Sequence, residues 1–149
     1  MKRFHRMKGV WVILVALTFA LSACATTKAT KPMTAADFVK EAKAKIKEIT
    51  VAEAKAKIES GAPLVVLDVR EPKEYKKGHL PKAINLPRGL LEFKVTKKIP
   101  NKDAYIIVYC KSGGRSSLAT NTLRQMGYKN AVSMAGGWKA WVKAGYPVE

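Results

Sequence analysis

Cysteine and histidine are scarce in this sequence, with two of each among 149 residues. Cys24 follows a segment typical of a cleaved leader, and if it is modified there, Cys110 is the only free thiol and His79 the only histidine of the mature chain. A single free thiol excludes a disulfide within the chain and leaves no second thiol to resolve an intermediate. One histidine and one cysteine also make too small a set for a metal centre. We therefore expect no metal site and no bound cofactor.

Acidic residues are also few: 11 Asp and Glu stand against 28 Lys and Arg, for a formal net charge of +17. The first 23 residues hold four basic residues and no acid, so the rest of the chain carries +13. Aromatic residues make up only 8%, and the lysines are interleaved with Glu and Ala rather than with rings that could stack on bases. This pattern argues against nucleic-acid partners. It favours anionic small molecules or an anionic membrane face, the alternative being an ordinary solvated basic surface.

The apolar run Val10–Ala20 is shorter than the roughly 20 residues that a membrane span takes. Four basic residues precede it and Leu21–Cys24 follows, an order typical of a secretory signal. The ending is similar to the bacterial lipoprotein cleavage box, whose cysteine becomes the lipidated N-terminus. We expect a leader over 1–23, lipidation of Cys24, a tether over 24–33, and export to the periplasmic face of the envelope. Ala25 favours the outer membrane; a plain signal peptide with an incidental Cys24 is the alternative.

A strand, a short loop and a helix surround the other cysteine. Tyr105–Tyr109 is apolar on both faces, as in a buried parallel strand, and the helical pattern Ser117–Met126 ends at Gly127. Cys110 should therefore lie at the carboxyl edge of a sheet, where α/β proteins bind ligands. Loop amides, a helix N-terminus and flanking cations favour a thiolate there. The alternative is that Cys110 is simply a small buried residue.

The remaining pattern predicts a helix over 34–48, then alternating helices and short strands up to the C-terminus. The strand Leu64–Leu67 brings Asp68 to the same edge as the cysteine. Asp68 and Arg70 could brace the site as an ion pair, although a purely structural pair is the better interpretation. Arg88, after the strand Ala83–Leu86, is equally compatible with a place at the pocket mouth and with an ordinary surface position.

The segment Cys110-Lys111-Ser112-Gly113-Gly114-Arg115-Ser116 resembles the active-site loop of rhodaneses, a family of sulfurtransferases. Three further segments match the family in the same order, and the resemblance covers about Ile49 to Glu149. These segments are Leu67-Asp68-Val69-Arg70-Glu71 with Glu74-Tyr75, Gly78-His79-Leu80-Pro81 through Pro87, and Gly136-Gly137-Trp138. The resemblance implies a rhodanese domain over 49–149, with a central, mostly parallel five-stranded sheet and helices on both faces.

The resemblance also implies an activity. In the family, the cysteine takes a sulfane sulfur from a donor such as thiosulfate, holds it as a persulfide, and passes it to cyanide or a thiol. We expect Cys110 to do this in a monomer, with Lys111 to Ser116 binding the anionic donor. A non-enzymatic sulfur carrier or interaction module is the alternative. Cysteine phosphatases use a similar loop, but with five residues between Cys and Arg; here four separate Cys110 from Arg115.

Overall fold

A computed structural model describes residues 31–149, and Pro32–Glu149 form one unit. The expected leader, Cys24 and most of the expected tether lie outside the described residues. Within the described part, no helix is both long enough and apolar enough to span a membrane.

The sheet has five strands that are all parallel, in the order β1-β5-β4-β2-β3. This confirms the expected fold class. Parallel strands need crossover connections, and helices fill them here. The strands are β1 Glu48–Ile49, β2 Val65–Asp68, β3 Ala83–Asn85, β4 Ile106–Tyr109 and β5 Ala131–Met134.

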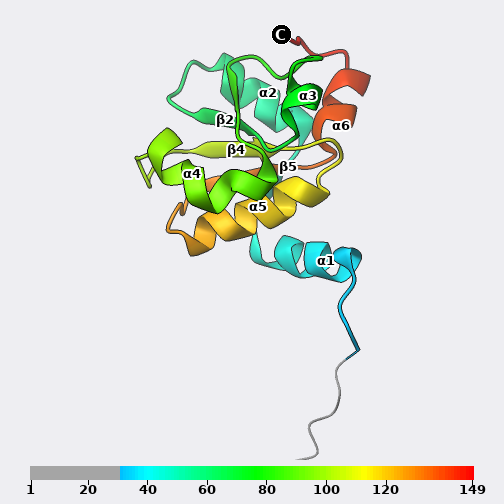
Figure 1. The fold of residues 1–149 in the computed structure, drawn as a ribbon. Coiled ribbons are helices and arrows are strands. Elements are labelled where there is room, and N and C mark those ends of the chain that lie inside the picture. The colour runs from blue at the N-terminus through cyan, green and yellow to red at the C-terminus, as the bar shows by residue number, and fades with distance from the viewer. Residues whose placement is uncertain (1–30) are drawn as a thin grey trace, which may run out of the picture. The chain divides into compact units, whose positions relative to one another are not determined.

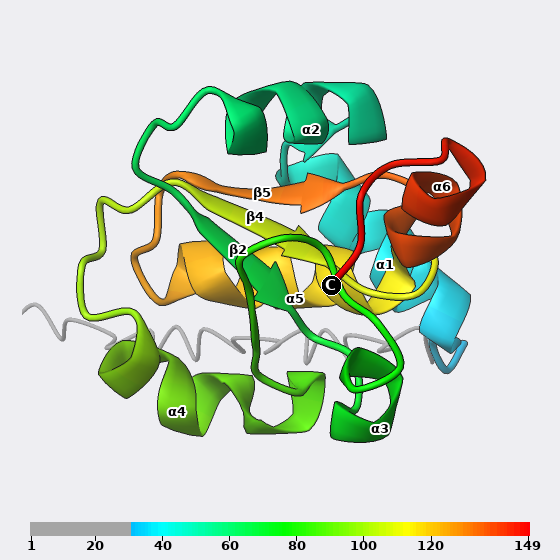
Figure 2. The ribbon, with the colours of Figure 1, turned by 90° about the horizontal axis from the view of Figure 1, so that it is seen from above.

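Helices cover both faces of the sheet (Figure 1, Figure 2). Helices α2 and α6 pack on one face, and α4 and α5 pack on the other. Helix α1 lies outside this sandwich, against α5. The bounds are α1 Ala35–Lys45, α2 Val51–Glu59, α3 Pro72–Tyr75, the 3-10 helix η1 Arg88–Leu90, α4 Leu91–Lys98, α5 Gly114–Gln125 and α6 Gly137–Lys143.

Capping boxes begin the helices α1 and α2. The Thr50 hydroxyl accepts from the Glu53 N–H at 3.1 Å, and the Glu53 carboxylate accepts from the Thr50 N–H at 2.7 Å. Thr34 and Asp37 make the same pair of bonds at the start of α1. Each box satisfies backbone donors that an isolated helix end leaves unpaired.

Strand β4 is the centre of the core, since all four of its residues are buried. Its side chains alternate between the two apolar layers: Ile106 and Val108 face α4 and α5, whereas Ile107 and Tyr109 face α2 and α6. The alternation continues into Cys110, which joins the layer under α4 and α5. The strand therefore fixes the side of the sheet on which the cysteine lies.

Two local features differ from what the sequence pattern suggests. The stretch from Lys94 to Asp103 has the polar composition of a connecting loop, yet α4 continues to Lys98 by burying Leu91 and Val95. Helix α5 begins at Gly114 rather than Ser117, so the loop after Cys110 is three residues long. Gly113, with φ +106°, makes the turn into α5, a backbone conformation that glycine adopts without strain.

Candidate active site

Cys110 follows the last residue of β4, at the carboxyl edge of the sheet. Its Sγ accepts a hydrogen bond from the Gly113 N–H at 3.2 Å, and the residue is only 1% exposed. It also packs in the apolar layer under α5. Cys110 is thus packed like a small buried residue, and its sulfur also accepts a hydrogen bond from the backbone. Among residues 31–149, the Gly113 N–H is the one loop amide that donates a hydrogen bond to the sulfur.

The first turn of α5 fixes the loop behind this amide. The Gly113 carbonyl accepts from the Ser117 N–H at 3.0 Å and from the hydroxyls of Ser116 and Ser117 at 3.0 and 2.7 Å. Ser116 also meets the Ser133 hydroxyl on β5 at 3.1 Å. Lys111 and Ser112 are exposed on the loop, while Gly114 lies beside Val39 of α1. The loop is therefore tied to the helix that follows it.

Arg115 does not lie free beside the sulfur. Its two guanidinium nitrogens donate to the two carboxylate oxygens of Glu74 at 2.8 and 2.9 Å. These hydrogen bonds lower the pKa of Glu74 to about 2, and they raise the pKa of Arg115. The pair joins α5 to α3 across the site, and the sequence alone assigned Glu74 no role.

Asp68 and Arg70 form a buried pair after β2. Arg70 Nη2 donates to Asp68 at 2.6 Å and to the Gly78 carbonyl at 2.8 Å, and its guanidinium lies 4.5 Å from the Trp138 ring centre. Burial lowers the pKa of Arg70, but the hydrogen bonds and charge of Asp68 outweigh this and leave it raised. The pair supports the loops around the site, in line with its structural interpretation.

A pocket of about 260 Å³ opens beside the cysteine loop. It is lined by Arg70, Glu74, Lys77, Lys111 and Trp138. Lys77 and Lys111 bring positive charge that no salt bridge among the described residues engages. The site therefore suits a small anion. Nothing in the sequence pattern singles out Lys77, which precedes the turn glycine Gly78.

Arg88 lies outside this pocket. Its guanidinium donates to Glu92 at 2.8 and 3.0 Å and to the Thr122 hydroxyl at 3.1 Å, so it links η1, α4 and α5. Elsewhere in the described chain, no group of three or more Cys, His, Asp or Glu side chains gathers in the manner of a metal site.

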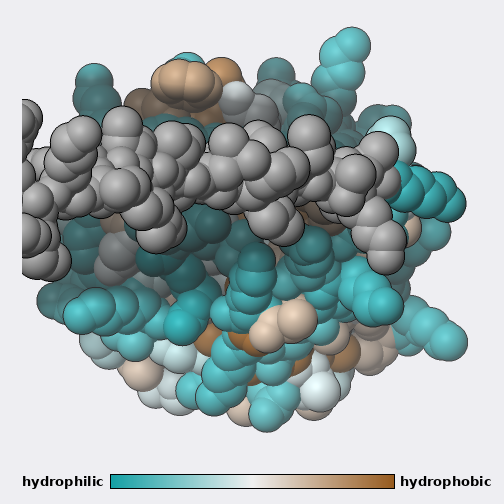
Figure 3. Space-filling model, turned by 90° about the horizontal axis from the view of Figure 1, so that it is seen from below, coloured by the Kyte–Doolittle hydropathy of each residue, from teal (hydrophilic) through white to brown (hydrophobic). Residues whose placement is uncertain are grey.

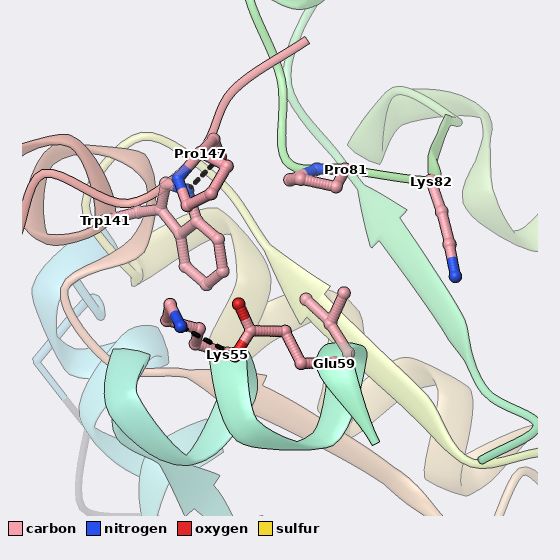
Figure 4. Close-up of a pocket in the computed structure, with 7 residues that line it drawn as sticks. Lys55, Glu59, Pro81, Lys82, Trp141 and Pro147 are labelled. Atoms are coloured by element: carbon pink, nitrogen blue, oxygen red, sulfur yellow. Dashed lines mark hydrogen bonds and ion pairs between the residues drawn. The ribbon is translucent and has the colours of Figure 1, made fainter. Parts of the chain in front are cut away.

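Another pocket, of about 270 Å³, lies between α2, α6 and the C-terminal segment (Figure 4). Its walls include the Trp141 indole, Pro81 and Pro147, with the Lys55–Glu59 ion pair at one side. None of the residues 110–116 lines it, whereas Lys111 of the cysteine loop lines the other pocket.

The rhodanese-like domain model matches residues 50–144, nearly two thirds of the sequence. The chain belongs to the rhodanese-like domain family. A sulfurtransferase of Allochromatium vinosum is 36% identical over 85 residues, which cover 57% of this chain and 78% of that protein. YrkF of Bacillus subtilis, named for a sulfur-carrier role, is 36% identical over 96 residues, which cover 64% of this chain and about half (51%) of YrkF.

Solved structures agree with the family. A rhodanese-related protein of Thermoplasma volcanium superposes with a TM-score of 0.61 at 37% identity, covering 69% of this chain and 97% of its own. A Rhodopseudomonas palustris protein, described as of unknown function and a possible tyrosine phosphatase, gives 0.72 at 32% identity, with 80% and 97% covered. This rhodanese-like domain and its relatives support sulfur transfer as the general chemistry.

Proposed function

We propose that this chain moves a sulfane sulfur from thiosulfate or a similar anionic donor to cyanide or a thiol, through a persulfide on Cys110. One observation carries the proposal. Cys110 Sγ accepts the Gly113 N–H at a strand end, beside a pocket lined by Arg70, Lys77 and Lys111. A nucleophile with a backbone donor and an adjacent anion site is what the first half of this reaction needs.

The reaction runs in two displacements. The Cys110 thiolate attacks the outer sulfur of thiosulfate; a new S–S bond forms, the donor S–S bond breaks, and sulfite leaves with the electron pair. The acceptor then attacks the outer sulfur of the persulfide, and the Cys110 sulfur leaves with the pair. The Gly113 N–H stabilises the sulfur anion, while Lys77 and Lys111 attract the donor. Arg115 holds the start of α5 through Glu74 rather than reaching for the donor.

Intact-mass measurement tests the proposal. Purified protein with Cys24→Ser, which leaves Cys110 as the sole thiol, should gain the mass of one sulfur atom after incubation with thiosulfate. Subsequent cyanide should remove that mass and release thiocyanate. The Cys110→Ser variant, which is nearly isosteric, should gain nothing. Failure of the thiol form to gain the sulfur, or gain by the serine form, would overturn the proposal.

A sulfur relay is the second candidate, favoured by the likeness to YrkF, which is named as a putative sulfur carrier protein. In a relay, a partner protein would take the sulfur and small acceptors would react slowly. Steady-state thiocyanate formation separates the two. Sustained turnover supports an enzyme, and loading of one sulfur without turnover supports a carrier.

Phosphatase chemistry fits the site less well, despite the description of the Rhodopseudomonas protein. The arginine that would bind a phosphate is already engaged by Glu74 through two hydrogen bonds. Only four residues separate it from Cys110. We expect no product from p-nitrophenyl phosphate under conditions in which the persulfide forms.

The proposed place of this reaction is the cell envelope, with the chain held by lipid on Cys24. Radiolabelled palmitate fed to a bacterial host should label the wild-type chain but not the Cys24→Ser variant. Equal labelling of both forms would rule out this anchor.

A further inference from the structure

The turn before α6 touches the cysteine loop at several points. The Trp138 N–H donates to the Cys110 carbonyl at 2.8 Å, and the Lys139 N–H donates to the Lys111 carbonyl at 3.0 Å. These donors belong to the first turn of α6, where a helix has no carbonyl partners of its own. The loop carbonyls take their place, so the helix start and the cysteine loop satisfy each other.

Gly137 makes this approach feasible. Its φ is +56°, and a Cβ built on it would overlap the Cys110 carbonyl oxygen and lie 3.0 Å from the Ser112 nitrogen. Both contacts are to backbone, which cannot swing aside as a side chain can. Any other residue at this position would push α6 and the loop apart.

The direction of the two carbonyls also sets the direction of the neighbouring amides. In a planar trans peptide, the C=O and the N–H of one unit point in opposite directions. With the carbonyls of Cys110 and Lys111 held by α6, the N–H groups of Lys111 and Ser112 point away from that helix.

We infer that Gly137 is a positioning residue for the sulfur chemistry: through the Trp138 and Lys139 amides, the start of α6 holds the carbonyls of Cys110 and Lys111, and so fixes the path of the loop that brings the Gly113 N–H to the sulfur. The inference rests on the proposed role of Cys110 as the nucleophile. It concerns how the loop is held, and it assigns Gly137 no contact with the substrate.

The Trp138 side chain connects α6 to another part of the pocket wall, at Arg70. Its ring lies 4.5 Å from the Arg70 guanidinium, and a Cβ on Gly78 would approach the ring at 3.2 Å. The first turn of α6 therefore holds the cysteine loop with its backbone and the Asp68–Arg70 pair with its indole.

The test compares Gly137→Ala with Gly145→Ala, both in the Cys24→Ser full chain. Gly145 also has a positive φ, +69°, but no atom lies within 4 Å of a Cβ placed there. The two variants thus share the backbone strain and differ in the contact with the loop. Neither changes the charged groups around the site, which are Lys111, Arg115, Glu74, Lys77, Lys139 and the Asp68–Arg70 pair.

The readout is the rate of Cys110 alkylation by iodoacetamide as a function of pH, which needs no sulfur donor. In Gly137→Ala, we expect the rate at neutral pH to fall about tenfold and the pH profile to move to higher pH, because the displaced loop no longer brings the Gly113 N–H to the thiolate. Gly145→Ala should keep the wild-type profile, although its positive φ makes it lose thermal stability as well. Equal profiles for Gly137→Ala and wild type would overturn the inference.

If Gly137→Ala does not fold, the inference can be tested by NMR on a chain that keeps Gly137. The amide signals of Trp138 and Lys139 should titrate with the same midpoint as the Cys110 thiol, while the Gly145 amide should not follow it. Absence of that shared midpoint would overturn the inference. Persulfide formation by intact mass separately reports the proposed function, so the two can fail independently.

Discussion

Single contacts decide what each side chain of the site can do. Arg115 is an example. The family resemblance made it a candidate for donor binding, whereas in the structure its guanidinium donates two hydrogen bonds to Glu74. Glu74 could not be selected from the sequence, because its partner is 41 residues away and only the fold brings them together. Cys110 was placed correctly at the strand end, since the apolar run that ends in it fixes its position.

The Glu74–Arg115 pair predicts a pH-dependent contribution to stability. The pKa of Glu74 falls from its ordinary 4.5 to about 2, so the pair stabilises the fold above pH 4.5 and loses this contribution as the pH drops towards 2. Glu74→Gln should cost about 1 kcal/mol at pH 7, because both side chains are about one-third exposed. Urea unfolding should show this difference shrinking between pH 5 and pH 2.

Glu59→Gln is the matched control for that measurement. Glu59 pairs with Lys55 on the exposed side of α2, far from the cysteine loop. A Glu74→Gln effect that is independent of pH, or no larger than that of Glu59→Gln, would contradict the prediction.

At the scale of elements, the apolar pattern predicted most helices and strands, and packing decided the rest. Strand β1 is two residues long, too short to leave a pattern, and it exists because β5 offers it an edge. Helix α4 is hard to recognise from the sequence because five of its eight residues are polar or charged. The early start of α5 depends on the left-handed backbone of Gly113, which no sequence period reports.

Helix α1 precedes the residues that match the family, yet it touches the site. Val39 lies against Gly114, and Ala42 is buried where α1 packs on α5. Ala42→Asp should detach α1 without unfolding the sheet, because an unpaired buried charge costs more than this short helix contributes. Hydrogen exchange should then accelerate throughout α1 and stay slow in β4.

Ala44→Asp, at an exposed position of α1, provides the comparison. It should leave the exchange of α1 near the wild-type rate. Rapid exchange in β4 of the Ala42→Asp protein would show instead that α1 is needed for the whole fold.

At the scale of the molecule, charge is the dominant property. Hydrophilic side chains predominate on the face shown in Figure 3, where apolar areas are small. The sequence predicted this basic surface from composition, but not that Lys77 and Lys111 would converge on one pocket, which needs the turn after α3. An excess of positive charge attracts anions at a distance comparable to the Debye length, and salt weakens that attraction.

We therefore predict a salt effect that depends on the charge of the reagent. Iodoacetate should alkylate Cys110 several-fold more slowly at about 0.3 M salt than at about 0.02 M, because screening removes the attraction. Neutral iodoacetamide should show little change, so it serves as the control. The measurement uses the Cys24→Ser chain, and identical salt dependence for both reagents would contradict the prediction.

The burial of Cys110 affects which molecules can react with its sulfur. Because only 1% of Cys110 is exposed, we expect bulky reagents to react with its sulfur more slowly than small ones. Thiosulfate is small, so it should reach the sulfur more readily than a disulfide carried by a folded protein. The outer sulfur of a persulfide would lie one S–S bond beyond Cys110 Sγ, so an acceptor would meet it before the cysteine sulfur.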